Sequence, residues 1–400
     1  MVQEDPVTVS PRVDPVVIVA AGAVTSIGAD LETFWSGLVD GRDGISTIER
    51  FRVDDLRVGR AGEIKHVVLP PGQRPTDCRA SLLLLAAAED LLRRCSLDAD
   101  PARIGVVVGT ALGGVEELEH ALDKDGRVSR AAAALYDSPG RALARRLGAR
   151  GPELTVSTAC ASGATALGIG ADLLRADRAD LVVAGGFDVL CRFVMRGFDA
   201  LRALTRERVR PFDRRRTGLL LGEGAALVLM ARDRDARGPR LGRLLGHAST
   251  SDGAHIAAPH PEGRGLQAAV RGALAQAGLD PRDVDFVSAH GTGTVLNDRI
   301  ETAVLKKCLG SRAGEIAINS IKGGIGHTMG AAATLEAIMC LLASRDGIVP
   351  PTHGYEEADP ECDLDYVPLR ARRLRPRVSL STSLGFGGCN AALVLEGSPA

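Results

Sequence analysis

The feature that most constrains the fold is an alternation of strands and helices that fills the first half of the chain and is repeated in the second. Continuous apolar runs are typical of strands covered on both faces. Strands are expected at residues 16–21, 104–109, 181–186 and 222–230, and then at residues 241–247, 284–289, 316–320, 378–381 and 391–395. The pattern predicts an α/β protein with two similar halves, residues 1–240 and residues 241–400.

Two helices rich in alanine and glycine are expected at equivalent places in the two halves. One follows Cys160 and extends to about residue 174, and the other follows His327. Aromatic residues make up only 3% of the chain, so a core of small side chains would let these helices approach closely. Other helices are expected at residues 31–38, 79–95, 265–277 and 298–309, whereas the arginine-rich residues 191–217 are expected to be irregular.

Composition narrows the class of protein. A chain of 400 residues is long enough for two domains or one large pseudo-symmetric unit. Its 45% hydrophobic and 25% charged residues are typical of a soluble globular protein. The net charge of −1 gives no reason to expect nucleic acid or a membrane surface as a partner. No apolar run reaches the roughly 18 residues that a membrane-spanning helix needs.

The eight cysteines are scattered, without a CxxC pair or the spacing of metal ligands. We therefore expect no metal site. Because the sequence also shows no signal peptide, we expect reduced thiols and a cytoplasmic location.

One of these cysteines lies where a strand is expected to turn into a helix. Residues 154–164 form a short apolar run, then Cys160, then small residues that favour a helix. At a helix N-terminus, free backbone N–H groups and the helix dipole favour a thiolate and lower the pKa of a cysteine. The stretch alone is also compatible with a buried structural cysteine in an alanine-rich helix.

Three motifs further along the chain support a nucleophilic cysteine. His290 lies in residues 288–294 (SAHGTGT), Lys322 and His327 lie in a glycine-rich loop before the second alanine-rich helix, and residues 383–390 form another glycine-rich turn. A cysteine, two histidines and a lysine are the groups that a site for thioester chemistry needs. Each motif is weak alone, but the set in this order is specific.

Together these motifs resemble those of the β-ketoacyl-[acyl carrier protein] synthases, which are decarboxylating condensing enzymes. The resemblance is to the elongating, ketosynthase II-like branch and extends from residue 16 to about residue 396, with residues 116–150 matching least. It implies the thiolase fold, in which two βαβαβαββ halves form an αβαβα layered architecture.

The resemblance also implies a role for each motif. Cys160 matches the nucleophile that accepts the acyl group, and the N–H groups of Cys160 and Phe386 would form an oxyanion hole. His290 and His327 match the two histidines that stabilise the enolate formed when malonyl thioester loses carbon dioxide. Lys322 matches the lysine before the second histidine, and Glu301 matches an acidic residue expected to pair with it.

Binding residues follow from the same resemblance. Thr292 and Thr294 are expected to hydrogen-bond the amides of the phosphopantetheine arm. Phe386, between two glycines, matches a gating phenylalanine, and Cys389 departs from relatives that usually carry threonine there. The acyl pocket is expected to be lined by Leu112, Ala159, Phe198 and Met329.

The implied partners are a carrier protein and a second subunit. Arg79, Arg206 and Arg208 either meet the acidic face of the carrier or belong to a solvated loop. The family implies a dimer, as a homodimer or with a chain-length-factor-like subunit, and no metal or organic cofactor beyond the carrier's phosphopantetheine. Residues 116–150 are shorter than the matching segment of housekeeping relatives and lack its usual aromatic contribution to the pocket, which favours a specialised polyketide or polyene pathway over bulk fatty acid synthesis.

Two other functions stay open. One is a thiolase or other acyltransferase that does not elongate, although two histidines rather than a second catalytic cysteine argue against a thiolase. The other is a chain-length-factor-like subunit without catalysis, although such subunits lack the nucleophilic cysteine. An initiating synthase with a Cys-His-Asn set is excluded because His327 stands where that asparagine would be.

Overall fold

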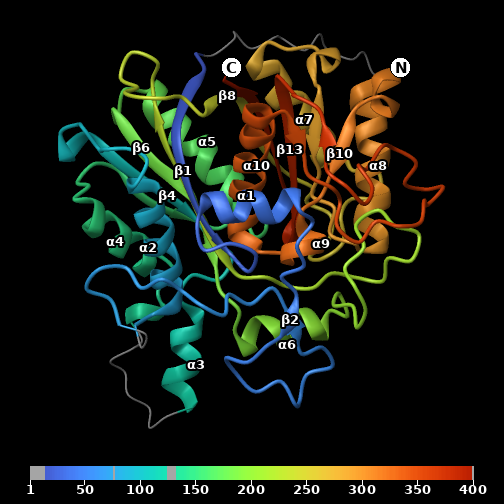
Figure 1. Ribbon diagram of the computed structural model, residues 1–400, viewed down its shortest axis with the longest axis horizontal. Helices are drawn as coiled ribbons and strands as arrows, with labels where there is room; N and C mark the ends of the chain where they lie inside the picture. The colour runs from blue at the N-terminus through green and yellow to red at the C-terminus, as the bar shows by residue number, and fades with distance from the viewer. Residues whose placement is uncertain (1–13, 75–76, 124–131, 399–400) are drawn as a thin grey trace.

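A computed structural model describes residues 14–74, 77–123 and 132–398, and within them ten strands form one continuous mixed sheet (Figure 1). The strands of the first half are β1 (Val16–Thr25), β4 (Ile104–Gly109), β5 (Glu153–Val156), β6 (Leu181–Asp188) and β7 (Gly224–Ala231). Those of the second half are β8 (Gly242–Ser251), β9 (Phe286–Ser288), β10 (Ala317–Asn319), β13 (Val378–Gly385) and β14 (Cys389–Gly397). The two-residue strands β2 (Ser46–Thr47) with β3 (Arg60–Ala61), and β11 (Ile348–Val349) with β12 (Arg372–Arg373), form separate small pairs.

The order of the strands shows that the fold is duplicated. The first half runs β1-β7-β6-β4-β5 and the second runs β8-β14-β13-β9-β10. In each half the first two pairings are antiparallel and the last two are parallel. A short antiparallel pairing of β1 with β8 joins the halves. The α/β class and the duplication predicted from the sequence are confirmed.

Helices cover the sheet in layers. They are α1 (Leu31–Val39), α2 (Arg79–Leu92), α3 (Val115–Asp123), α4 (Ser138–Leu147), α5 (Ser162–Arg175), α6 (Arg192–Ala200), α7 (Arg264–Ala277), α8 (Val295–Leu309), α9 (Lys322–Ile325) and α10 (Ala332–Asp346). The central helices α5 and α10 pack against each other and against strands of both halves, whereas α2 and α7 cover the outer faces. Of the helices in the described ranges, none has the length and apolar character to cross a membrane.

Small residues let the two central helices meet. A Cβ atom on Gly163 of α5 would lie 2.7 Å from both the carbonyl oxygen of Gly330 and the hydroxyl of Thr334. Glycine is therefore needed where α5 crosses the start of α10, because real Cβ contacts are longer than this. The contact brings the loops that precede the two helices to the same place.

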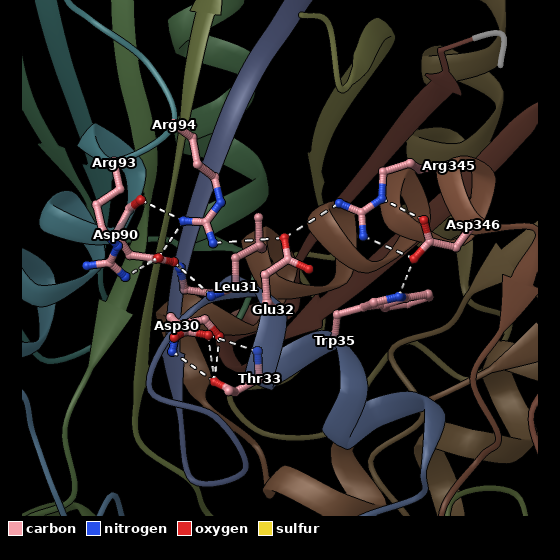
Figure 2. Close-up of polar contacts among 11 residues, drawn as sticks. Asp30, Leu31, Glu32, Thr33, Trp35, Asp90, Arg93, Arg94, Arg345 and Asp346 are labelled. Atoms are coloured by element: carbon pink, nitrogen blue, oxygen red, sulfur yellow. Dashed lines mark hydrogen bonds and ion pairs between the residues drawn. The ribbon is translucent and has the colours of Figure 1, made fainter.

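Helix α1 connects α2 with α10 (Figure 2). Its capping residue Asp30 forms a capping box with Thr33. The buried carboxylate of Asp90 in α2 accepts the backbone N–H of Leu31 at 2.8 Å. The indole N–H of Trp35 donates to Asp346 of α10 at 2.5 Å. These contacts fix α1 between the two halves.

The sequence analysis missed one helix and left another region unassigned. Residues 191–217 were expected to be irregular, but α6 forms there, with Val194 and Met195 buried on its inner side. The expectation was wrong because two arginines of this helix, Arg192 and Arg196, pair with Asp55 of a distant segment rather than pointing to solvent alone. The weakly matched residues 116–150 contain α3 and α4 on either side of residues outside the described part of the chain.

Candidate active site

Cys160, His290 and His327 line one cavity of about 360 Å³, together with Phe386. Cys160 follows β5, His290 follows β9, and His327 lies between β10 and α10. The duplicated topology places the carboxyl ends of these strands around the α5–α10 contact. Residues that are far apart in the sequence therefore form one site, as their motifs predicted.

A sharp turn presents the Cys160 sulfur to the cavity. Ala159 has a φ of +50°, a left-handed conformation that a residue with a side chain rarely adopts. The hydroxyl of Ser162 stabilises this turn, because it donates to the Ala159 carbonyl at 2.6 Å and accepts the Thr158 N–H at 2.9 Å. Helix α5 begins at Ser162, so Cys160 lies directly before the helix N-terminus.

Two backbone N–H groups converge on the sulfur. Those of Cys160 and Phe386 both lie close enough to the sulfur to lower the pKa of the thiol. The close approach requires glycine at position 385, where a Cβ would lie 2.9 Å from the Thr158 carbonyl oxygen and 3.1 Å from the Cys160 nitrogen. Such a pair of donors can stabilise negative charge on a sulfur or on a carbonyl oxygen bound beside it.

The pKa of Cys160 differs from the expectation. Burial raises this pKa to about 12, and the positive charge of Lys322 and the two N–H groups only partly oppose the shift. The prediction that the helix N-terminus lowers the pKa was wrong, because Cys160 is only 5% exposed and the effect of burial is larger. Burial therefore favours the neutral thiol over the thiolate.

The two histidines form a pair of neutral donors. Their ring centroids are 5.2 Å apart and the rings are nearly perpendicular. Burial and the nearby charge of Lys322 hold both pKa values well below the ordinary histidine value. The Met329 N–H donates to Nδ1 of His327 at 3.3 Å, which places the proton of this neutral ring on Nε2. This Nε2 is buried and has no hydrogen-bond partner in the described part of the chain.

Lys322 does not pair with Glu301, so this expectation was wrong. Its ammonium forms an ion pair with Glu336 of α10, and both side chains are almost fully buried. Burial raises the pKa of Glu336 to about 7, and the charge of Lys322 opposes that rise. Glu336 comes 14 residues after Lys322 in the sequence, so only the fold of α9 and α10 brings the two side chains together.

Glu301 has a different task, because it holds the His290 loop. Its carboxylate accepts the backbone N–H groups of His290 and Gly291, each at 2.8 Å, and the hydroxyl of Thr382 at 2.7 Å. Asp298, one turn earlier on α8, accepts the N–H of Gly293 at 3.1 Å. Burial raises the pKa of Asp298 to about 6.

Asp188 is a site residue that the sequence analysis missed. This buried carboxylate at the end of β6 accepts the hydroxyl of Thr110 at 2.7 Å and the N–H of Leu112 at 3.0 Å. It also accepts the N–H of Gly330 at 2.7 Å, directly before α10. Burial raises the pKa of Asp188 to about 6. A lone aspartate ending an apolar strand was the signal that could have identified it.

The residues expected to line an acyl pocket mostly lie together. Leu112, Phe198 and Met329 belong to one apolar cluster. The Phe198 ring lines the cavity, with its centroid 5.3 Å from that of Phe386. Ala159 is not part of this cluster and lies next to Gly385 instead. Of the four residues expected to line an acyl pocket, Phe198 alone is among the described residues that line this cavity.

The threonines and the turn around Phe386 also face the cavity. Thr292 and Thr294 both line it, with their hydroxyls 3.0 Å apart. The turn after Phe386 is held from outside, since Asp252 donates its N–H to the Gly388 carbonyl at 2.8 Å. Cys389 begins β14 and pairs with Gly385 across the hairpin.

The three arginines expected near a carrier protein differ in exposure. Arg79 is mostly buried, forms an ion pair with the buried Glu223 and donates to the Ile64 carbonyl. Arg79 is therefore a structural residue, and its expected contact with a carrier was wrong. Arg206 and Arg208 are exposed, and Arg208 pairs with Glu356 at 3.3 Å.

Comparison with known proteins agrees with this geometry. Residues 13–236 match the family model "Beta-ketoacyl synthase, N-terminal domain" and residues 241–356 match "Beta-ketoacyl synthase, C-terminal domain". The chain is 39% identical to the tetracenomycin polyketide synthase ketoacyl synthase alpha subunit of Streptomyces glaucescens, over 95% of this chain and 96% of that protein. It is 35% identical to 3-oxoacyl-[acyl-carrier-protein] synthase 2 of a Synechocystis strain, over 95% and 97%. The solved ishigamide ketosynthase/chain length factor superposes with a TM-score of 0.90 at 33% identity, over 96% of this chain and 100% of that one.

Proposed function

Because the chain belongs to the β-ketoacyl synthase family, acyltransferases with the thiolase fold, we propose that it is a catalytically active condensing enzyme. It extends an acyl group on Cys160 by decarboxylative Claisen condensation with a malonyl carrier protein, giving a β-ketoacyl carrier protein. The observation that carries this proposal is a single cavity that holds a thiol with two aimed N–H donors and two neutral imidazoles. A chain-length-factor-like subunit would not need that set.

In the first step the acyl group moves to Cys160. The sulfur attacks the thioester carbonyl of the acyl carrier while a neutral imidazole takes the thiol proton. The carbonyl oxygen gains negative charge and accepts the N–H groups of Cys160 and Phe386. The tetrahedral intermediate collapses, the carrier's pantetheine sulfur leaves, and it takes up the proton from the imidazole.

In the second step malonyl thioester loses carbon dioxide. The electron pair of the breaking C–C bond forms an enolate, whose oxygen accepts hydrogen bonds from His290 and from Nε2–H of His327. The enolate carbon attacks the acyl carbonyl on Cys160, and the carbonyl oxygen again accepts the two backbone N–H groups. The Cys160–acyl bond then breaks, and the departing sulfur takes up one proton.

Lys322, Glu336 and Glu301 set the protonation state and the position of the imidazoles. The Lys322 charge disfavours protonation of both rings, so they are neutral donors when the enolate forms, and an imidazole that has taken the thiol proton readily releases it to the leaving sulfur. Glu336 fixes the lysine, and Glu301 fixes the backbone at His290. Decarboxylation of a malonyl thioester supplies its own electron sink, so we propose no metal and no organic cofactor beyond the carrier's phosphopantetheine, which belongs to the substrate.

The proposed partners are a carrier protein and a second subunit. Thr292 and Thr294 are proposed to bind the pantetheine amides, and the exposed Arg206 and Arg208 to meet the carrier. Solved relatives named as ketosynthase/chain length factor support a dimer, either of two copies or with a chain-length factor. The polyketide synthase relative supports a specialised polyketide or polyene pathway, with fatty acid synthesis as the alternative.

The test is to mix the protein with acyl carriers and malonyl carrier and to follow every protein by intact mass. A Cys160→Ala variant removes the nucleophile, and Cys95→Ala, at the end of the outer helix α2, is a matched cysteine control. We expect an acyl adduct on the wild type and on Cys95→Ala but not on Cys160→Ala, and a product that has lost carbon dioxide and gained two carbons.

Two other outcomes would change the proposal. Acylation without extension, even with a chain-length-factor subunit added, would indicate a non-elongating acyltransferase. No adduct with any acyl group would indicate a non-catalytic subunit, despite the presence of Cys160.

A further inference from the structure

We propose that Glu119 of α3 is a positioning residue that sets acyl-chain selectivity by holding α6, the helix that carries Phe198. The inference rests on the proposed function, because it assigns the apolar cluster beside Phe198 to the acyl chain. It concerns a contact between two helices that lies outside the catalytic groups.

Helix α6 forms one wall of the proposed acyl pocket. Val194, Met195 and Phe198 point from it into the apolar cluster that also holds Leu112 and Met329. Phe198 in addition lines the cavity with Cys160 and lies against the Phe386 ring. A small displacement of α6 would therefore change the width of the pocket directly beside the gate.

The N-terminus of α6 depends on another helix. Its own capping residue, Cys191, makes no side-chain hydrogen bond to the first turn. Instead the Glu119 carboxylate accepts the backbone N–H of Arg192 at 3.2 Å and that of Phe193. A carboxylate at this position satisfies free N–H groups and complements the helix dipole. Glu119 thus supplies the missing cap from outside.

Helix α3 can act as an anchor because it is itself fixed. Glu116, one turn before Glu119, is only 4% exposed and forms an ion pair with Arg50. Arg50 also donates to the carbonyl of Leu190, next to the start of α6. The same arginine therefore holds α3 and the segment that enters α6 together.

The other polar contacts of α6 are weaker candidates for this task. Asp55 pairs with the side chains of Arg192 and Arg196, and Arg57 pairs with Asp199, but these side chains are still partly exposed, from 17% for Asp199 to 59% for Arg196. Exposed ion pairs contribute little because water and salt screen them. Glu119 differs because it bonds the helix backbone itself.

The experiment compares Glu119→Ala, Glu119→Gln and the control Asp55→Asn with the wild type. Acylation of Cys160 is timed with short-chain and long-chain acyl thioesters by intact mass, and hydrogen exchange is measured for peptides that cover α6. For Glu119→Ala we expect the long-to-short ratio of acylation efficiencies to change about fivefold, and exchange in the first turn of α6 to speed up about fivefold, the usual effect of losing a cap. Glu119→Gln keeps an acceptor, so it should restore most of both values, and Asp55→Asn should change neither by more than about twofold.

Each failure has its own signature. If exchange in α6 does not change in Glu119→Ala, the cap is not needed and the inference is overturned, whatever the enzyme does. If exchange speeds up but the selectivity ratio stays at the wild-type value, α6 is held by Glu119 without setting selectivity, and the inference is also overturned. A wild type that never acylates Cys160 would instead refute the proposed function and, with it, the role in selectivity.

Discussion

The turns that precede α5 and α10 have the same construction but carry different chemistry. Each contains a residue with a side chain and a φ of +50°, Ala159 before α5 and Met329 before α10. The first turn presents the sulfur of Cys160, and the second presents the imidazole of His327. The duplicated scaffold thus brings both turns to one cavity, although the reactive residue differs in position: Cys160 directly follows Ala159, whereas His327 comes two residues before Met329.

The carboxylates behind the two turns extend the comparison. In the first half, Asp188 holds the loop after β4, which carries apolar residues such as Leu112. In the second half, Glu301 and Asp298 hold the loop after β9, which carries His290. Both halves therefore use a buried carboxylate to fix a loop, but only the second adds a buried lysine and its charge. Under the proposed function, the first half supplies the acyl-accepting sulfur, and the second half supplies the groups for decarboxylation together with the Phe386 N–H that also serves acylation.

Removal of the nucleophile should have the largest effect. In Cys160→Ala we expect condensation to fall on the order of 10⁴-fold or more, because no other group can carry the acyl chain. Decarboxylation of malonyl carrier should continue, since both imidazoles and Lys322 remain. Intact-mass measurement of acetyl carrier formation checks this. Loss of decarboxylation along with condensation would break the proposed division of labour.

The converse variant is His327→Ala. We expect condensation to fall about 10²- to 10³-fold, because the enolate loses a donor in a buried site. Acylation of Cys160 should stay within about tenfold of the wild type, since the two backbone N–H groups are untouched. Rapid-quench mass spectrometry of the acyl adduct separates the two steps. An equal loss in both would mean that His327 also serves the first half.

The carboxylates should give a matched pH effect in the two halves. Burial raises the pKa of Asp188 and of Asp298 from 3.8 to about 6. A raised carboxylate pKa contributes stability that is fully present below pH 3.8 and is lost as pH rises through about 6. The variants Asp188→Asn and Asp298→Asn have no carboxyl group to titrate, so each should be more destabilising at pH 4 than at pH 7, by about 2 kcal/mol.

Denaturant unfolding of both variants and the wild type at the two pH values measures that difference. Equal changes in unfolding free energy in the two variants would support the same structural role for a buried carboxylate in each half. A pH dependence in only one variant, or one of the opposite sign, would contradict it.

The smallest expected effect concerns the contact between the central helices. Gly163→Ala would place a methyl group 2.7 Å from the Gly330 carbonyl, so we expect a loss of about 1 to 3 kcal/mol of unfolding free energy. Gly197→Ala in α6 is the matched control, because nothing lies within 4 Å of the added atom. The control should gain about 0.5 to 1 kcal/mol from helix propensity. Thermal and urea unfolding would contradict the packing argument if both variants behaved alike.

The sequence predicted the reactive residues better than their surroundings. Cys160, His290 and His327 stand in local patterns that the chain shows directly, and the duplicated order of strands follows from repeated apolar runs. The partner of Lys322 could not be predicted in this way, because Glu336 comes next to it only when α9 and α10 fold. The same holds for Asp188, whose acceptor role depends on three separate segments.

Burial explains the remaining differences. The pKa of Cys160 depends on how much of the thiol the second half covers, and no local pattern records that quantity. The α6 helix was missed because its arginines suggested a solvated loop. In the fold, Asp55 forms an ion pair with Arg196, and Glu119 accepts the backbone N–H of Arg192; both acidic residues come from distant segments of the chain. The prediction for Arg79 was wrong for the same reason, since its partner Glu223 lies directly before β7, far away in the sequence.

The position of Phe386 has a consequence for the chain during synthesis. The last elements to emerge, β13 and β14, bring the second backbone donor to Cys160 and close the cavity around it. Until they pair with β8 and β9, the cysteine has neither the imidazoles nor the Phe386 N–H beside it. If Cys160 is the nucleophile, as proposed, acyl loading therefore depends on the pairing of β13 and β14 with the rest of the sheet, although both strands lie more than 200 residues after the cysteine.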